Sequence, residues 1–189
     1  MQTSKEIRST VTSEGSIEIS IATIEKPTPS ENEVLIKVEA APINPSDLGL
    51  LISFAANLDS LSVSGSGDDT VTKIKIHEGL IKAMAPRIDQ PMSVGNEGGG
   101  VVEDAGTNAK ELIGKVVGVA GGAMYSQYRC VPAANCLVMD NDTTPSEAAS
   151  SFVNPLTALG FVETMHLESH SAIVHTAAAS NLGRMLVRI

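Results

Sequence analysis

The sequence predicts a mainly β fold that is followed by α-helices. Three observations support this prediction. Apolar and polar residues alternate in several short runs up to residue 142, as they do in half-buried strands. Gly and Pro separate these runs at short intervals, which is typical of a barrel or a sandwich. From Thr143 onward the alternation stops, and residues that begin helices take its place.

The expected elements follow one another along the first part of the chain. Two prolines at 27 and 29 predict a turn, and prolines at 42 and 45 end a strand, after which Ser46 or Asp47 can cap a short helix at 48–54. The Ser-, Gly- and Asp-rich residues 59–70 predict a surface loop, and residues 79–85 form at most a weak helix. Strands are expected at 16–23, 33–41, 71–76, 112–120, 125–131 and 136–139.

The last part of the chain contains two helix starts and one strand–turn–helix pattern. Thr144 is expected to cap a helix, with Pro145 in its first turn and Glu147 as the capping-box partner. Pro155 should break this helix, and Asn154 can cap the next one. A short apolar strand at 172–175 runs into a turn of small residues and a further helix start, the local arrangement that cradles a dinucleotide pyrophosphate.

Composition excludes several classes of partner. The formal charge is −9, no cluster of Lys and Arg occurs, and aromatic residues make up 3% of the chain. We therefore expect no nucleic acid and no membrane as partners, because both are bound through cationic patches. Cys130 and Cys136 do not have the spacing of a zinc pair and are expected to be free thiols. With no apolar leader or membrane-length apolar run, the expected location is cytoplasmic.

Five motifs that occur in order carry a family resemblance. They read EVLIKVEAAPINPSDL, GNEGGGVV, AMYSQYRCVP, SEAASSFVNPLTALG and VHTAAASNLG. Together they resemble the medium-chain dehydrogenase/reductase superfamily of alcohol dehydrogenases, most closely its zinc-free quinone oxidoreductase branch, with mitochondrial-type enoyl thioester reductases nearby. The resemblance implies a GroES-like β-barrel as the catalytic domain at 1–142. Residues 143–189 would then be the start of a truncated dinucleotide-binding Rossmann domain, with its first helices and first βα unit.

The resemblance also decides what we expect of metals. Zinc-dependent members hold their catalytic zinc with thiolate and imidazole, and the matching positions here are Asn44, Asn96 and Val153. Amides and an alkyl group are poor zinc ligands, and the chain lacks the four cysteines of a structural zinc lobe. We therefore expect no zinc.

The resemblance suggests a set of cofactor-binding residues, and each of them also has a simpler interpretation. Asn44, Asn154 and Thr157 match positions near the nicotinamide. Alternatively, Asn44 forms a turn, Asn154 caps a helix, and the Thr157 hydroxyl bonds its own helix. The phosphate turn keeps only the last glycine of an Ala-x-x-Gly-x-x-Gly pattern and could be an ordinary capped connection. Its expected cofactor-binding residues are Ala177, Ser180, Asn181, Leu182 and Gly183.

The catalytic residue stays unassigned, with Asn44 and Glu97 as cleft candidates. Glu97 is the one carboxylate within the glycine-rich residues 95–100, and it could hold a polar network in the cleft or simply pair locally. Similar enoyl thioester reductases carry a proton-donating Tyr soon after the NPSD segment. No Tyr occurs there in this chain, so the proton donor is open and water could serve.

Two functional hypotheses of different classes follow. In the first, the intact parent protein transfers a hydride from NADPH, with NAD not excluded, to a quinone or conjugated carbonyl; an enoyl thioester reductase is the alternative enzyme. In the second, the chain is a catalytically inert, truncated domain that serves folding, assembly or binding. An exposed apolar face on the last helix would invite dimerisation, so a homodimer stays open. Its residues would be Leu182, Met185, Leu186 and Ile189.

Overall fold

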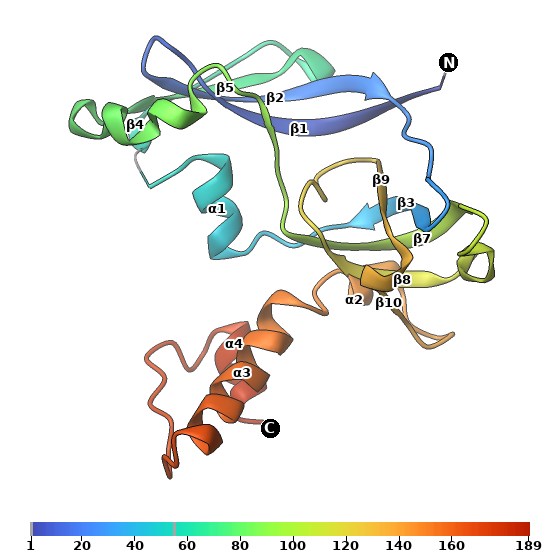
Figure 1. Ribbon diagram of the computed structural model, residues 1–189. Coiled ribbons are helices and arrows are strands. Elements are labelled where there is room, and N and C mark those ends of the chain that lie inside the picture. Colours follow the sequence, from blue (N-terminus) through green and yellow to red (C-terminus); the bar gives the residue numbers. More distant parts are fainter. Residues whose placement is uncertain (1, 55) are drawn as a thin grey trace.

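The computed structural model describes residues 2–54 and 56–189, which form two antiparallel sheets and a helical C-terminal part (Figure 1). The first sheet has the spatial order β4 (Ala56–Ser64), β5 (Val71–Ile76), β2 (Ser16–Glu25), β1 (Thr3–Val11) and β6 (Met92–Ser93). The second sheet has the order β10 (Cys136–Val138), β8 (Val116–Ala120), β7 (Glu97–Ala105), β3 (Glu33–Ala40) and β9 (Tyr128–Pro132). The predicted mainly β fold class is confirmed.

Helices connect the sheets and form the C-terminal part. α1 (Pro45–Leu51) lies between the two sheets, α2 (Pro145–Ala148) lies against the second sheet, and α3 and α4 pack on each other away from the sheets (Figure 1). The bounds of the last two are Val153–Leu167 and Asn181–Leu186, and the 3₁₀ turns are η1 (Gly67–Asp69), η2 (Glu78–Arg87), η3 (Lys110–Leu112) and η4 (Ala133–Asn135). Within the described ranges, no helix combines the length and the apolar character that crossing a membrane requires.

Each sheet has its own aliphatic core. The larger core belongs to the second sheet, and its buried residues are Val34, Ile36, Val102, Ala105, Ala109, Val117, Val119, Met124 and Val131. A smaller cluster under the first sheet consists of Val11, Ile17 and Ile76. The alternating apolar residues of the strands supply both clusters, because every second side chain points to the same face. The chain contains no Trp and only three Phe, so short branched side chains fill the interior.

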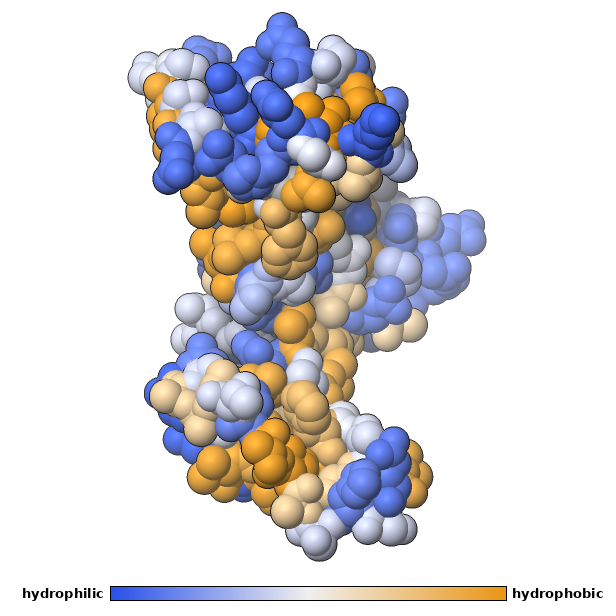
Figure 2. All heavy atoms as spheres, turned by 90° about the vertical axis from the view of Figure 1, so that its left-hand side faces the viewer, coloured by the Kyte–Doolittle hydropathy of each residue, from blue (hydrophilic) through white to orange (hydrophobic). Residues whose placement is uncertain are grey.

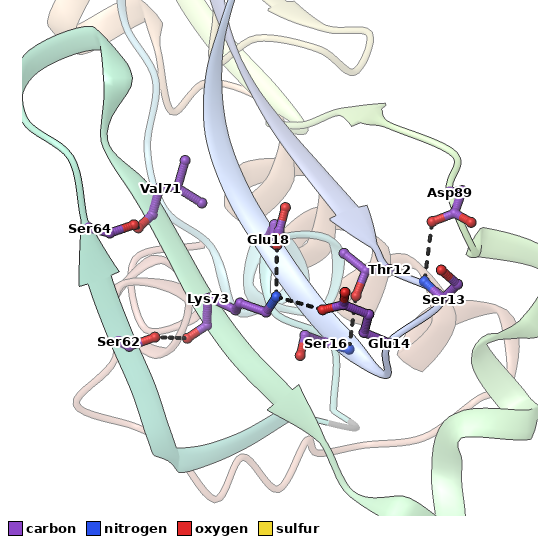
Figure 3. A network of polar contacts seen from close by, with 10 residues as sticks. All are labelled: Thr12, Ser13, Glu14, Ser16, Glu18, Ser62, Ser64, Val71, Lys73 and Asp89. Carbon is purple, nitrogen blue, oxygen red and sulfur yellow. Dashed lines mark hydrogen bonds and ion pairs between the residues drawn. The ribbon is translucent and has the colours of Figure 1, made fainter.

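The first sheet carries a polar network on its solvent-facing side (Figure 3). The Lys73 ammonium on β5 lies 3.1 Å from the carboxylate oxygens of both Glu14 and Glu18. On the edge strand β4, the Ser62 hydroxyl donates to the Lys73 carbonyl at 3.3 Å. These side chains are exposed, so the ion pairs are screened by solvent. The backbone ladder and the apolar cluster therefore account for most of the stability of this sheet.

Glycines on β7 and β8 allow α2 to pack directly on the second sheet. A Cβ atom on Gly99 of β7 would lie 2.4 Å from the Pro145 carbonyl oxygen, and one on Gly118 of β8 would lie 2.6 Å from the Ala148 carbonyl oxygen. The lack of a side chain at these two glycines therefore lets the α2 backbone approach the sheet closely. The capping box is confirmed, since the Thr144 hydroxyl accepts from the Glu147 N–H and the Glu147 carboxylate accepts from the Thr144 N–H.

The expected surface loop at 59–70 is wrong for residues 59–64, because strand β4 continues to Ser64, whereas residues 65–70 form a largely exposed connection that contains η1. Leu61 and Val63 alternate with serines, and the hydroxyls of Ser62 and Ser64 donate to carbonyls of β5. Serine can therefore stabilise an edge strand that its composition did not predict. Strand β1 was not expected either, because polar and charged residues occupy most of its sequence.

Three expectations about helices and strands are also corrected. Residues 172–175 form no strand, because no described strand lies beside them to bond their backbone groups. Asn154 does not cap α3: the helix begins one residue earlier, at Val153, with Pro155 in its first turn, where no N–H partner is required. The first helix starts at Pro45 rather than at 48, so Asn44 is its N-cap. A domain boundary after residue 142 stays a prediction.

The close contact between Gly99 and α2 predicts that a larger residue at position 99 lowers the free energy of unfolding. We expect Gly99→Ala to lower the free energy of unfolding by about 1–3 kcal/mol, because the new methyl group would collide with the α2 backbone. Gly160→Ala in exposed α3 is the matched control, since no atom lies within 4 Å of its added Cβ, and it should stabilise the chain by about 0.5–1 kcal/mol. Urea unfolding measures both; a Gly99→Ala protein as stable as the parent would contradict the packing described.

Candidate functional site

Two carboxylates are completely buried where the second sheet meets α1 and α3. Asp47 of α1 and Glu97 of β7 both have 0% exposed area. Charged side chains are almost never fully buried unless other groups neutralise or hydrogen-bond them. The donors that surround these two carboxylates therefore define the candidate site.

Asp47 ties the start of α1 to the segment that precedes β7. One carboxylate oxygen accepts from the Asn44 N–H at 2.8 Å, and the other accepts from the Asn96 N–H at 2.8 Å. The Asn96 side-chain amide in turn donates to the Ser46 hydroxyl at 2.9 Å. Its place in the sequence predicts only a cap for Asp47. Its link to Asn96 was missed, because nothing in the sequence indicates which distant backbone N–H a carboxylate will meet.

Glu97 joins the second sheet to the C-terminal helices. Its Oε1 accepts from Nδ2 of Asn44 at 2.8 Å. Its Oε2 accepts from the backbone N–H groups of Phe152 and Val153, at 3.0 and 2.9 Å. These N–H groups lie at the start of α3, where a negative charge is stabilising. The partners of Glu97 are 53 to 56 positions away in the sequence, so Glu97 does not pair locally.

The structure brings together two of the residues expected near the nicotinamide. Nδ2 of Asn154 lies 3.4 Å from Oδ1 of Asn44, so the start of α1 and the start of α3 meet through their amides. Thr157 lies one turn further along α3, and its exposed hydroxyl donates to the Val153 carbonyl at 2.5 Å. That bond matches the simpler interpretation of Thr157, in which its hydroxyl bonds its own helix.

The three positions that match zinc ligands in related enzymes converge on these carboxylates. Asn44 and Val153 both donate to Glu97, and Asn96 donates to Asp47. These amide and alkyl side chains do not provide the thiolate and imidazole donors that zinc prefers, so the site does not fit the metal. Across residues 2–54 and 56–189, no group of three or more His, Cys, Asp or Glu could hold a metal ion. The absence of zinc stays a prediction.

The two cysteines take no part in this site. Burial raises the pKa of both the Cys130 and Cys136 thiols to about 11. Both are therefore protonated at neutral pH, and a protonated thiol is neither a good nucleophile nor a good metal ligand.

Tyr125 lies close to Asp47 and Glu97, and its hydroxyl stays protonated at neutral pH. Its hydroxyl donates to the Pro42 carbonyl at 2.9 Å. Burial raises the pKa of Tyr125 to about 12, and the negative charges of Asp47 and Glu97 add to the effect. A phenol held in this way acts as a hydrogen-bond donor to the backbone rather than as an acid at neutral pH.

The expected phosphate turn forms hydrogen bonds within itself. The Ser180 hydroxyl caps α4 by accepting from the Gly183 N–H at 3.0 Å, and the Asn181 side chain accepts from Arg184. Gly183 is buried, and a Cβ there would lie 2.4 Å from the Ala178 carbonyl oxygen. The Ala177 carbonyl accepts from the Ser180 N–H, which closes the turn. The geometry thus matches a capped connection, and its use for a phosphate stays a prediction.

The apolar face expected on the last helix is largely covered. Leu182, Met185 and Leu186 are half-buried, because α4 lies against α3, whereas Ile189 is 60% exposed. The expectation of a fully exposed face is therefore wrong for three of its four residues. Other apolar side chains remain exposed on the C-terminal helices, including Leu156, Leu159, Leu167 and Val187. Figure 2 shows hydrophobic residues gathered over this lower end of the molecule and again beneath the hydrophilic upper sheet.

A mostly apolar groove of about 550 Å³ opens between the two sheets. Its apolar lining comes from both sheets and α1, namely Ile7, Ile19, Ile21, Val38, Ala40, Ala41, Ile43, Leu51 and Met124. Tyr125 also lines the groove, which therefore borders the buried polar network. Asn44 follows Ile43 directly in the chain.

Solved structures with a similar fold are known. A Mesorhizobium loti protein described as an NADPH:quinone reductase matches 99% of this chain with a TM-score of 0.66 and 25% identity, over 51% of its own length. Escherichia coli quinone oxidoreductase, solved in complex with NADPH, matches 98% of this chain with a TM-score of 0.60 and 19% identity, over 48% of its own length. The resemblance to the medium-chain dehydrogenase/reductase superfamily is confirmed.

A curated relative adds a second activity within the same superfamily. Mitochondrial enoyl-[acyl-carrier-protein] reductase of Xenopus tropicalis is 28% identical over 165 residues, which cover 85% of this chain and 39% of the relative. No family model matches the chain. The chain thus spans about half the length of the similar solved structures and less of the curated relative.

The raised pKa of Tyr125 generates a prediction for alkaline solution. The unfolded chain loses this proton near pH 10 and the folded chain near pH 12, so the stabilisation is complete below pH 10 and is lost as the pH rises toward 12. We expect Tyr125→Phe to flatten this part of the stability profile, whereas Tyr128→Phe, which keeps the buried phenol, should not. Ultraviolet titration of tyrosinate in the two variants checks the assignment, and a Tyr125 signal that titrates near pH 10 would contradict it.

Proposed function

We propose that this chain is the N-terminal part of an NADPH-dependent reductase of the quinone oxidoreductase type. The substrate would be a small electrophilic acceptor, a quinone or a conjugated carbonyl, reduced without zinc. The observation that supports this most directly is the meeting of Asn44, Glu97 and the start of α3 in one buried network. The superfamily resemblance predicts that Asn44 and Asn154, which belong to or border this network, lie near the nicotinamide.

The reduced nicotinamide would supply the hydride, and the protein's own groups would bind and orient. Asn44 and Asn154 offer neutral amides from the barrel and from α3, so both units could contact one ligand. The mostly apolar groove beside Tyr125 suits a flat, uncharged acceptor. Both buried carboxylates are engaged by N–H donors, so neither serves as the proton donor, and water is left for that step.

An enoyl thioester reductase is the second candidate enzyme, and the amphibian relative favours it. Against it stands the segment that follows Asp47, where related enoyl reductases carry a proton-donating tyrosine. In this chain the described residues 48–54 contain Phe54 but no tyrosine. A quinone requires no dedicated proton donor in the protein, so the quinone reductase is the better match.

A binding or assembly module without catalysis is the remaining alternative. The apolar side chains exposed on α3 and after it favour this alternative for the 189-residue chain by itself. Apolar patches of this kind commonly mark contact surfaces. The reductase hypothesis requires that the protein binds a pyridine nucleotide, whereas the module hypothesis does not.

Binding of NADPH distinguishes these hypotheses. We expect cofactor fluorescence to change on titration into the product of the whole coding region, with weaker or no change for residues 1–189, because the phosphate turn alone is a small contact surface. Asn44→Ala in the longer product should weaken binding. Failure of both forms to bind NADPH would refute the reductase proposal and leave the module.

Metal analysis tests the zinc prediction separately. We expect purified protein to contain zinc far below one equivalent, even after incubation with excess zinc and desalting, because Asn44, Asn96 and Val153 offer no thiolate or imidazole. Asn44→Cys with Asn96→His, which introduces two typical zinc ligands at matching positions, serves as the positive control. Stoichiometric zinc in the unaltered chain would contradict the prediction.

A further inference from the structure

We propose that Glu97 is a positioning residue that determines which end of the Asn44 amide faces the ligand. Glu97 holds the NH₂ group of Asn44, so Asn44 presents its carbonyl oxygen and selects a group that donates a hydrogen bond. The inference deepens the proposed function and rests on it in taking the ligand to be a reduced nicotinamide nucleotide. Such a ligand carries two suitable donors, its ribose hydroxyls and its carboxamide NH₂ group.

The chemistry of the Glu97–Asn44 pair determines how the Asn44 amide is oriented. An ionised carboxylate only accepts hydrogen bonds, whereas a side-chain amide donates from nitrogen and accepts at oxygen. Nδ2 of Asn44 lies 2.8 Å from Oε1 of Glu97. With the carboxylate on that side, the amide can bond only by turning its nitrogen inward. Its oxygen, Oδ1, therefore points away from Glu97.

Glu97 has little freedom to move. Its other oxygen accepts from two backbone N–H groups, those of Phe152 and Val153, and its side chain is fully buried. Rotation of the carboxylate would leave these donors without partners in the interior, which is unfavourable. The Asn44 backbone is held as well, because its N–H donates to Asp47 at 2.8 Å. Both partners of the pair are thus fixed.

A ligand can reach Oδ1 of Asn44 from the side of Asn154. Oδ1 of Asn44 accepts from Nδ2 of Asn154, but at 3.4 Å this contact is much longer than the 2.8 Å bond to Glu97. Asn44 is 4% exposed and Asn154 is half-buried. A ligand would reach Oδ1 by displacing the Asn154 amide, which is the weakest link of the network. Because Asn154 is itself a donor here, its replacement must also be a donor.

Exchanging the acid and the amide tests this inference. In Glu97→Gln, the new side chain keeps an oxygen for the α3 N–H groups but turns an NH₂ group toward Asn44, so the Asn44 amide must turn over. Asn44→Asp places two carboxylates opposite each other. The double variant Asn44→Asp with Glu97→Gln restores a donor–acceptor pair of reversed polarity, and one oxygen of residue 44 again faces Asn154.

The first measurement uses the 189-residue chain without any ligand. We expect nuclear Overhauser contacts between the Asn44 NH₂ protons and the Asn154 NH₂ protons to strengthen in Glu97→Gln, because the Asn44 nitrogen then faces α3. The amide protons of Phe152 and Val153 should stay protected from exchange, since Gln still accepts from them. Unchanged Asn44 contacts in a folded Glu97→Gln protein would overturn the inference.

The second measurement is NADPH affinity in the product of the whole coding region. We expect Glu97→Gln to bind at least about tenfold more weakly, since a mispaired buried hydrogen bond commonly costs that much. The double variant should recover to within about threefold of the parent. A double variant that binds no better than Glu97→Gln, or a Glu97→Gln protein with parental affinity, would contradict the inference. If Glu97→Gln fails to fold, the double variant alone decides.

The two measurements separate this inference from the proposed function. A reversed Asn44 amide in Glu97→Gln, together with a parent protein that does not bind NADPH, would support the positioning role and refute the reductase proposal. Parental NADPH binding that Glu97→Gln leaves unchanged would support the reductase proposal and refute the positioning role.

Discussion

The burial of one carboxylate, Glu97, is the constraint on which the arrangement of this molecule depends. A buried charge is tolerated only where donors surround it, and here the donors come from Asn44 and from the start of α3. The second sheet, the segment before α1 and the C-terminal helices must therefore meet at one point. The candidate site is that meeting point. Its geometry follows from the need to supply protein N–H donors to both carboxylate oxygens of Glu97.

Glycine makes this meeting possible. Because Gly99 and Gly118 lack side chains, α2 lies directly on β7 and β8, and a short link then brings Phe152 and Val153 within hydrogen-bond distance of Glu97. The interior around it consists of short aliphatic residues. The packing of α2 on these two glycines thus determines where the N–H groups at the start of α3 lie. The stability of the fold and the shape of the site therefore depend on the same contacts.

The electrostatic character of the site is unusual for a reactive centre. Its two carboxylates are both engaged by N–H donors, and the phenol of Tyr125, whose pKa is raised to about 12, stays protonated. What remains for a ligand is a pair of neutral amides and an apolar groove. Such groups suit binding and orientation better than proton exchange, which supports the proposed function, in which a bound cofactor supplies the reactivity.

Elements whose signals are local could be predicted from the amino-acid sequence. The alternation of β3 and the capping box of Thr144 and Glu147 act through neighbours a few positions away. The glycines of residues 95–100 allow a close approach, but the segments that approach them, such as α2 at Gly99, are distant in the sequence. The family resemblance named Asn44 and Asn154, and Glu97 was named as the one carboxylate of the glycine-rich segment. Only the tertiary structure decided that Glu97 bonds the start of α3, that Asp47 is buried against Asn96, that a serine-rich segment forms β4, and that residues 172–175 form no strand. These outcomes depend on which distant segment supplies a donor or a neighbouring strand, and a local pattern carries no information about that.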